Sequence, residues 1–410
     1  MKQFGFSILH KDKRTKARVG EIITPHGVIK TPAFVPVGTQ ASIKSLTPDE
    51  VKEVGVQLFF INTYHMYLRP GIEVVEKLGG LHRFMGWDGP IITDSGGFQV
   101  YSLGRASILQ DDADNGSRAL VKINDDGVEF RSHWDGTKHL FTPENSMERQ
   151  WRLGADIHIA FDDCTSYPVT HQKAKQSMER THRWAERSLE EHKRLAYSSS
   201  EAGRRVEKSQ KRSSRLRSNN TYYQALYGSI QGSVYENLRK ESAKFISSLD
   251  FDGIAIGGVA VGESKKEMVD VLDWVMPILL EEKPRHLLGV GEIDDIFALV
   301  EHGIDTFDCV QPTRLARMGR VYTNPINGTY EIDITRKIFA EDAIPIDPEC
   351  QCYTCTHFFR AYIHHLFRVR ELLAYRLATV HNLWFIHRLV DDMRRAIEDR
   401  SFLALKKKWL

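Results

Sequence analysis

An α/β fold of the (β/α)8 barrel type is predicted by eight short apolar segments that alternate with amphipathic helical patterns along the chain of 410 residues. The segments are continuous rather than alternating in polarity and rich in Ile, Val and Phe, which is typical of strands buried on both faces. They are residues 33–37, 58–62, 90–94, 156–162, 225–231, 253–258, 286–291 and 305–309. An open doubly wound sheet is the alternative, but no strand followed by Gly-x-Gly-x-x-Gly and a helix occurs near the start.

Helix signals lie between these strands. Thr47 is followed by Pro48 and, three residues after Thr47, by Glu50, which is the pattern of an N-cap with a capping box. Apolar residues recur at three- and four-residue spacing in 233–249, 264–280 and 292–303. A helix is therefore expected after several of the strands, as the barrel requires.

Two stretches interrupt the repeat within the barrel. Residues 104–141 contain Asp-Gly pairs between alternating runs, so inserted β-hairpins are expected there. Residues 197–222 are rich in Ser, Asn and Arg, so a flexible basic insertion is expected. A solvated loop is the favoured interpretation, and a sequence-independent phosphate contact, which the charge would suit, is the alternative.

A Cys-x-Cys-x-x-Cys cluster opens the C-terminal region and holds three of the chain's five cysteines. Its members are Cys350, Cys352 and Cys355. No hydrophobic export signal precedes it, so a reducing, cytoplasmic setting is expected, where clustered thiols hold metal more often than they form disulfides. Zinc then needs a fourth donor, usually an imidazole. The candidates are His357, His364, His365 and His381.

Four protein ligands leave no open coordination position, so this zinc is expected to be structural rather than catalytic. Long helical patterns follow the cluster. We therefore expect two parts, a catalytic barrel over residues 1–340 and a zinc-binding helical subdomain over 341–410 that packs on the barrel.

Composition and charge give no sign of general nucleic-acid binding or of membrane association. The chain carries 56 basic and 54 acidic residues, a formal charge of +2, so no global nucleic-acid signature is present and any basic surface must be local. No apolar run approaches the roughly 20 residues that span a bilayer, so no membrane association is expected.

The active site of such a barrel lies at the C-terminal ends of its strands. The predicted strand ends carry Asp94, Asp162, Asp163, Gln231, Gly257, Gly258 and Asp308. Buried carboxylates need partners or a function, although any single one can be a strand-end cap or a salt-bridge partner. Metal-dependent hydrolysis on this fold commonly uses a His-x-His pair, which this chain lacks.

Two carboxylates in a closed pocket instead suit a displacement at a sugar carbon, with one as nucleophile and the other as general acid and base. Gln231 and the main chain at Gly257–Gly258 can read the edge of a planar heterocycle, and Phe98 can stack on its face.

Six motifs in order, together with the cysteine pattern, resemble the bacterial tRNA-guanine transglycosylases. They are TDSGGFQV (93–100), FDDCT (161–165), QGSVYENLR (231–239), GGVAVGE (257–263), GVG (289–291) and FDCVQPTR (307–314). AYIHH (361–365) and HN (381–382) complete the family's zinc pattern. The resemblance covers about residues 3–400 apart from 197–222.

The resemblance implies a pentosyltransferase that exchanges the wobble guanine of tRNAs with GUN anticodons (those for Asp, Asn, His and Tyr) for 7-aminomethyl-7-deazaguanine, a step of queuosine biosynthesis. It implies that Asp308 attacks C1′ of the ribose to form a covalent intermediate and that Asp94 is the general acid and base. Salvage of queuine is an alternative, for which a glycine is expected in place of Val261. A non-catalytic tRNA-binding subunit is a second alternative, but such proteins are expected to lose the catalytic aspartates.

The resemblance also implies binding residues. Contacts to the base are expected from Ser95, Phe98, Asp162, Gln231, Gly258, Glu263 and Leu288. Arg314 and Arg317 are expected to hold tRNA phosphates, with plain helix-surface arginines as the alternative. One structural Zn²⁺ per subunit is expected on Cys350, Cys352, Cys355 and His381. A homodimer is expected as well, with Tyr362 and His365 at its interface.

Overall fold

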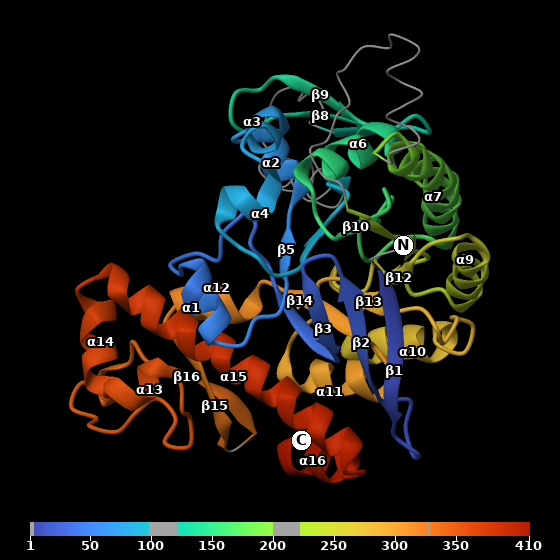
Figure 1. Ribbon diagram of the computed structural model, residues 1–410. Helices are drawn as coiled ribbons and strands as arrows, with labels where there is room; N and C mark the ends of the chain where they lie inside the picture. The colour runs from blue at the N-terminus through green and yellow to red at the C-terminus, as the bar shows by residue number, and fades with distance from the viewer. Residues whose placement is uncertain (1–3, 98–120, 200–221, 327) are drawn as a thin grey trace. The chain divides into compact units, whose positions relative to one another are not determined.

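The computed structural model describes residues 4–97, 121–199, 222–326 and 328–410. All eight predicted strands are present: β4 (Ala33–Pro36), β5 (Phe59–Ile61), β6 (Ile91–Thr93), β10 (Ile157–Ile159), β11 (Ala225–Ile230), β12 (Gly253–Ile256), β13 (Arg285–Leu287) and β14 (Thr306–Cys309). They form one sheet in the order β4-β14-β13-β12-β11-β10-β6-β5, and a parallel bridge between Val37 and Phe60 joins its two ends, so that the strands follow one another around the barrel in chain order. Figure 1 labels five of these strands, β5, β10, β12, β13 and β14. The predicted (β/α)8 TIM barrel is confirmed.

Helices follow the strands, as the alternating pattern predicts. They are α1 (Pro48–Glu53), α2 (Thr63–Leu68), α3 (Ile72–Lys77), α4 (Gly80–Met85), α6 (Pro143–Leu153), α7 (His171–Ser199), α9 (Glu236–Ser248), α10 (Lys265–Val275), α11 (Ile293–Glu301) and α12 (Gln311–Arg317). The predicted capping box of α1 is present, because the Thr47 hydroxyl accepts from the Glu50 amide and the Glu50 side chain accepts from the Thr47 amide.

The predicted hairpin insertion forms a three-stranded antiparallel sheet of β7 (Val121–Ile123), β8 (Val128–Arg131) and β9 (Lys138–Phe141). Its first part and nearly all of the predicted basic insertion, residues 200–221, lie outside the described residues. The character of that insertion and the domain boundary at residue 340 stay predictions.

Two sheets were not predicted. An N-terminal sheet consists of β1 (Gly5–Lys11), β2 (Arg18–Thr24) and β3 (Gly27–Thr31), and a hairpin consists of β15 (Arg320–Ile326) and β16 (Thr329–Asp333). The C-terminal region continues with the 3-10 helix η2 (Lys337–Phe339), α13 (Tyr353–His357), α14 (Arg360–Arg368), α15 (Leu372–Glu398) and α16 (Phe402–Trp409). Within the described parts of the chain, no helix is both long and apolar enough to cross a membrane.

The chain's contacts divide it into two compact units, each with its own packing. The first unit is mainly Ile61–Leu288 and contains β6 and β10 to β12. There, aromatic side chains of the inserted sheet pack with Tyr64 of α2 and Trp184 of α7. The second unit includes Val28–Phe60 and Gly289–Leu410, and in it α15 packs against α12, β15 and β4.

Candidate active site and metal centre

Three buried polar side chains from adjacent strand ends meet in the first unit. Asp162, which follows β10, accepts hydrogen bonds from Gln231 Nε2 at 2.7 Å and from Ser95 Oγ at 3.3 Å. We call these three residues, with Gly257 and Gly258, the strand-end cluster. Burial raises the pKa of Asp162 to about 6, against the lowering effect of the hydrogen bonds from Gln231 and Ser95. Asp162 is therefore an acceptor whose charge responds to its surroundings near neutral pH.

Gly257 and Gly258 allow the Gln231 amide to lie directly on the main chain. A Cβ atom at Gly257 would meet Gln231 Nε2 at 2.7 Å, and one at Gly258 would meet Gln231 Oε1 at 2.5 Å. Gly258 also has φ +64°, a left-handed conformation that favours glycine. Among the described residues, none accepts a hydrogen bond from the Gly258 amide. The cluster thus presents a carboxylate acceptor beside a main-chain donor.

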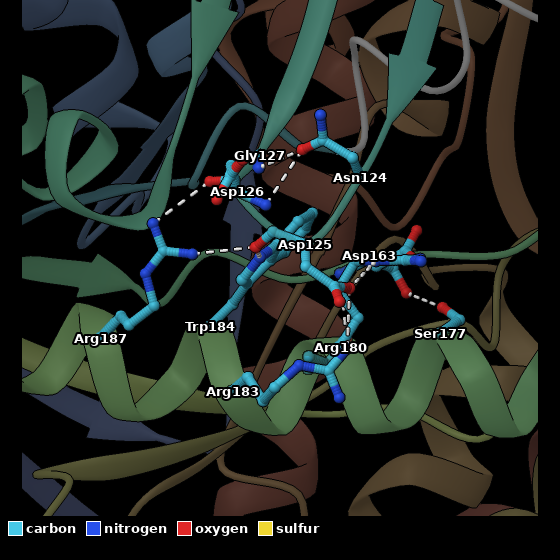
Figure 2. A network of polar contacts seen from close by, with 11 residues as sticks. Asn124, Asp125, Asp126, Gly127, Asp163, Ser177, Arg180, Arg183, Trp184 and Arg187 are labelled. Atoms are coloured by element: carbon cyan, nitrogen blue, oxygen red, sulfur yellow. Dashed lines mark hydrogen bonds and ion pairs between the residues drawn. The ribbon is translucent and has the colours of Figure 1, made fainter.

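Asp163, the neighbour of Asp162, is committed to helix α7 instead (Figure 2). Arg180 Nη1 donates to Asp163 Oδ2 at 2.6 Å. The Asp163 amide donates to Thr181 Oγ1 at 3.0 Å, and Ser177 Oγ donates to the Asp163 carbonyl at 2.5 Å. Of the two aspartates in the FDDC motif, only Asp162 belongs to the strand-end cluster.

The same face of α7 holds the turn of the inserted sheet. The carbonyl of Asp125, between β7 and β8, accepts from Trp184 Nε1 at 2.8 Å and from Arg187 Nη1 at 2.9 Å, and its carboxylate accepts from Arg183 at 2.8 Å (Figure 2). Arg180 reaches Asp125 as well, at 3.3 Å. One helix therefore anchors both the inserted sheet and the loop that carries Asp162.

Asp94 follows β6 and is fixed by the residues that follow β5. Asn62 Nδ2 donates to Asp94 Oδ2 at 2.5 Å, and the Thr63 amide donates to Asp94 Oδ1 at 2.7 Å. Thr63 Oγ1 also donates to the Asp94 carbonyl at 2.6 Å. These bonds set the orientation of the carboxylate. Sequence reasoning missed Asn62 and Thr63, and the available signal was their position, at the end of the predicted strand 58–62 and directly after it.

Asp308 is the last residue but one of β14, in the second unit, and is buried. The Gly289 amide, in the GVG motif, donates to Asp308 Oδ1 at 3.1 Å. On the following helix Arg314 is exposed, whereas Arg317 folds back and donates to the Thr313 carbonyl at 2.7 Å. The structure thus places a carboxylate at the end of the last strand with a main-chain donor on it.

The other residues predicted to contact the base, Glu263, Leu288 and Phe98, are not part of the strand-end cluster. Glu263 Oε2 accepts from the Val261 amide at 3.0 Å and so fixes the loop that follows β12. Leu288 is partly buried directly after β13, and its amide donates to the Ile256 carbonyl. Phe98 lies outside the described residues.

The predicted zinc ligands converge in the second unit. The three sulfur atoms lie 3.6, 3.5 and 3.3 Å from His381 Nδ1, for Cys350, Cys352 and Cys355 in that order. A tetrahedral zinc ion with Zn–S of about 2.3 Å and Zn–N of about 2.0 Å separates such ligand atoms by about 3.5 Å. His381 Nε2 donates to the Tyr322 carbonyl at 2.7 Å, which turns the Nδ1 lone pair toward the sulfurs. This buried group can bind a metal ion.

Asn382, next to His381, ties the metal group to its surroundings. Its Nδ2 donates to the carbonyls of Pro312 and Arg320, each at 3.0 Å, and its Oδ1 accepts from the Tyr322 amide at 3.0 Å. Pro312 lies at the start of α12, which directly follows β14. The sequence pattern His381-Asn382 gives Asn382 no role of its own, and the three hydrogen bonds show that it connects the metal group to β15 and α12.

Buried aspartates at the strand ends of a (β/α)8 barrel are typical of a barrel enzyme, and this one also has a buried group of three cysteines and one histidine that can bind a metal ion. The family model described as queuine tRNA-ribosyltransferase matches residues 12–410. The chain therefore belongs to the queuine tRNA-ribosyltransferase family. Members of this family are tRNA-guanine transglycosylases, so the chain is a pentosyltransferase that acts on tRNA and a base.

Curated relatives agree over nearly their whole length. The chain is 46% identical over 404 residues to the queuine tRNA-ribosyltransferase of Thermoanaerobacter pseudethanolicus, covering 98% of this chain and 96% of that one. It is 47% identical over 400 residues to that of Desulforamulus reducens, with 98% and 96% covered. For the Roseiflexus sp. protein of the same name the identity is 44% over 412 residues, with 99% and 98% covered.

Proposed function

We propose that the protein exchanges guanine at the wobble position of tRNAs with GUN anticodons for 7-aminomethyl-7-deazaguanine, a step of queuosine biosynthesis. The strand-end cluster is the observation that supports this most. Guanine offers N–H donors at N1 and the 2-amino group beside an acceptor at O6. Asp162 offers carboxylate oxygens and Gly258 an amide donor, which is the complementary order. The 7-deazaguanines keep this edge and differ only at position 7.

For the reaction we propose Asp308 as the nucleophile. Its carboxylate oxygen attacks C1′ of the ribose as the C1′–N9 bond breaks, and the electron pair leaves with guanine. Asp94 donates a proton to the departing guanine and later accepts the N9 proton of the incoming base. N9 of that base then attacks C1′ and releases the Asp308 carboxylate. The hydrogen bonds from Gly289 to Asp308 and from Asn62 to Asp94 support these roles, because each orients its carboxylate.

For base recognition we propose Asp162 and Gly258 for the polar edge, with Ser95 and Gln231 holding Asp162 in place. Glu263 is proposed to set the main chain that meets the aminomethyl group, since it binds the Val261 amide. Phe98 and Leu288 are proposed for the two faces of the base. Arg314 and Arg317 are proposed for tRNA phosphates, and the exposure of Arg314 fits that role better than the folded-back Arg317.

We propose that one Zn²⁺ per subunit occupies the cysteine–histidine group, where a closed four-ligand site fixes structure. It would join α13 to α15 through Cys355 and His381. A cytoplasmic homodimer, with Tyr362 and His365 at the interface, completes the proposal, and the exposure of Tyr362 is compatible with it. Val261, where queuine-salvaging enzymes are expected to have glycine, favours the smaller base.

Incorporation of labelled guanine tests the proposal. A tRNA with a GUN anticodon should take up label, and a chase with 7-aminomethyl-7-deazaguanine should release it faster than a chase with queuine. The same tRNA with adenine at the wobble position is the control and should take up none. A lack of label in the GUN tRNA would overturn the proposal, and faster release by queuine would favour salvage.

A further inference from the structure

Arg239, on α9, is a fully buried arginine whose guanidinium is surrounded by main-chain oxygens. Its Nη1 donates to the carbonyl of Gly257 at 2.7 Å and its Nη2 to the carbonyl of Gly258 at 2.7 Å. It also donates to the carbonyls of Ser233 at 2.5 Å and Ile230 at 3.2 Å. No carboxylate in the described part of the chain forms an ion pair with it.

Burying a cation without a counter-ion is costly, so a purely structural arginine would normally be paired. Burial lowers the pKa of Arg239 only to about 10, so the side chain is still charged at neutral pH. Its positive charge therefore lies directly behind the strand-end cluster. Within the described residues, its hydrogen bonds all go to main-chain oxygens of the two segments that form this cluster, the end of β11 with the following turn (230–233) and residues 257–258.

The bond to the Gly257 carbonyl has a specific consequence. That carbonyl and the Gly258 amide belong to one peptide unit, so a charged donor on the oxygen polarises the unit and makes its N–H a stronger donor. The Gly258 N–H has no acceptor among the described residues, as noted for the strand-end cluster. The second bond, to the Gly258 carbonyl, keeps the next peptide from rotating, and φ of +64° at Gly258 leaves little steric resistance of its own to such rotation.

We propose that Arg239 is a positioning residue of the base site, which holds and polarises the Gly257–Gly258 peptide so that the Gly258 N–H donates to the 6-oxygen of the base. The inference rests on the proposed function. It adds an electrostatic role, because negative charge develops on the base as the C1′–N9 bond breaks and a preorganised donor stabilises that charge. Arg239 itself touches neither the base nor the ribose.

Arg239→Lys and Arg239→Met test this through guanine-exchange kinetics. Loss of a donor that touches a developing oxyanion costs roughly 10²–10³-fold in kcat, so loss of its support should cost less, about tenfold to hundredfold in kcat/KM for the base. KM for tRNA should stay within about twofold, since no phosphate or ribose contact is removed. Arg239→Lys should retain more activity than Arg239→Met, because the charge remains.

A probe base separates positioning from general damage. In 6-thioguanine the edge donors are kept but sulfur, a weak acceptor, replaces the 6-oxygen. The wild-type preference for guanine over 6-thioguanine should shrink in both Arg239 variants. Arg285→Met is the matched control. Arg285 is also buried and donates to a main-chain carbonyl, that of Leu279, but it lies at the N-terminal end of β13, the opposite end from the strand-end cluster. The substitution should lower the melting temperature and leave the preference unchanged.

Three results would overturn the inference: an unchanged base kcat/KM in folded Arg239→Lys enzyme, an unchanged preference between the two bases, or an equal change in Arg285→Met. If Arg239→Met does not fold, Arg239→Lys still decides. A wild-type enzyme that exchanges no guanine would instead refute the proposed function, so the two failures are distinguishable.

Discussion

The strand-end cluster and the cysteine–histidine group both consist of buried polar groups. They differ in whether all of these groups have partners among the described residues. In the cysteine–histidine group the three sulfurs and His381 Nδ1 all point to one position, and the only remaining polar atom, Nε2, is bonded to Tyr322. In the strand-end cluster Asp162 is held by Gln231 and Ser95, but the Gly258 amide has no acceptor among the described residues.

The difference fits the two roles proposed above, a metal-binding group that stabilises the fold and a cluster that binds the base. A closed set of ligands satisfies its polar atoms within the protein and leaves no position for a substrate. A binding site keeps a donor or acceptor uncommitted and holds it in place from behind, so that the substrate completes the set. The five predictions below test this distinction, from the largest expected effect to the smallest.

Asp308→Asn should abolish exchange and the tRNA adduct that survives denaturation, because an amide cannot replace the carboxylate nucleophile. Its Oδ1 can still accept from Gly289, so the melting temperature should stay within a few degrees. Denaturing gels of enzyme mixed with labelled tRNA and guanine measure the adduct. An Asp308→Asn enzyme that exchanges guanine at the wild-type rate would show that the nucleophile lies elsewhere.

Cys352→Ser should act on the other group and change stability first. Zinc binding contributes on the order of 10 kcal/mol to folding in small zinc peptides, so even partial loss should lower the melting temperature by about 10 °C or more. Metal content per chain and thermal unfolding measure this. Cys164→Ser is the control, because Cys164 is buried but lies outside the group. Full metal content with unchanged melting would refute the ligand assignment.

Asp94→Ala should reduce turnover by roughly 10²–10⁴-fold, as expected for the loss of a general acid and base. The variant keeps Asp308, so a slow adduct should still form. Single-turnover exchange of labelled guanine gives the rate. A loss below about tenfold would show that water or another group moves the proton.

Gly258→Ala should weaken base binding, because the new Cβ would lie 2.5 Å from Gln231 Oε1. We expect a rise of about tenfold or more in KM for guanine, since the donor beside Asp162 must move. Gly262→Ala is the control: it also has a positive φ, +122°, but its Cβ would meet nothing closer than 3.9 Å. Equal effects would attribute the loss to backbone strain rather than to the cluster.

The pH dependence of base binding should follow Asp162, whose pKa is raised to about 6. Guanine needs the ionised carboxylate as acceptor, so kcat/KM for guanine should fall about tenfold between pH 7 and pH 5. For stability the sign is reversed. A carboxyl with a raised folded pKa costs stability as pH rises from 3.8 through 6, so Asp162→Asn should stabilise the fold at pH 7. A profile that is flat down to pH 5 would contradict this assignment.

The sequence predicts the barrel well because each of its strands is a continuous apolar run. It misses the N-terminal sheet because β1, with the sequence GFSILHK, is only partly buried and mixes polar with apolar residues. The capping box at Thr47 was also predictable, because, like an apolar run, it is formed by residues that are close together in the chain.

The candidate site shows the same distinction between features that depend on neighbouring residues and features that depend on contacts between distant parts of the chain. The residues proposed to carry the chemistry, Asp94 and Asp308, lie at or near the ends of the predicted strands 90–94 and 305–309, and this position predicted them. Arg239 was not found, because its role depends on main-chain oxygens, which have no signature in the sequence. The choice between Asp162 and Asp163 came from family resemblance alone, and the contacts of Arg180 now supply a physical reason for it.

The place of β14 in the barrel also affects how the protein is made. β14 carries Asp308 and pairs with β4, which the ribosome completes some 270 residues earlier. Until β14 emerges, the edge of β4 that will receive it is unpaired, and the nascent chain has the residues proposed to bind the base but lacks Asp308, the proposed nucleophile. Because domains fold as units during synthesis, we expect a chain with Asp308 as its nucleophile to become reactive only when its synthesis is nearly finished.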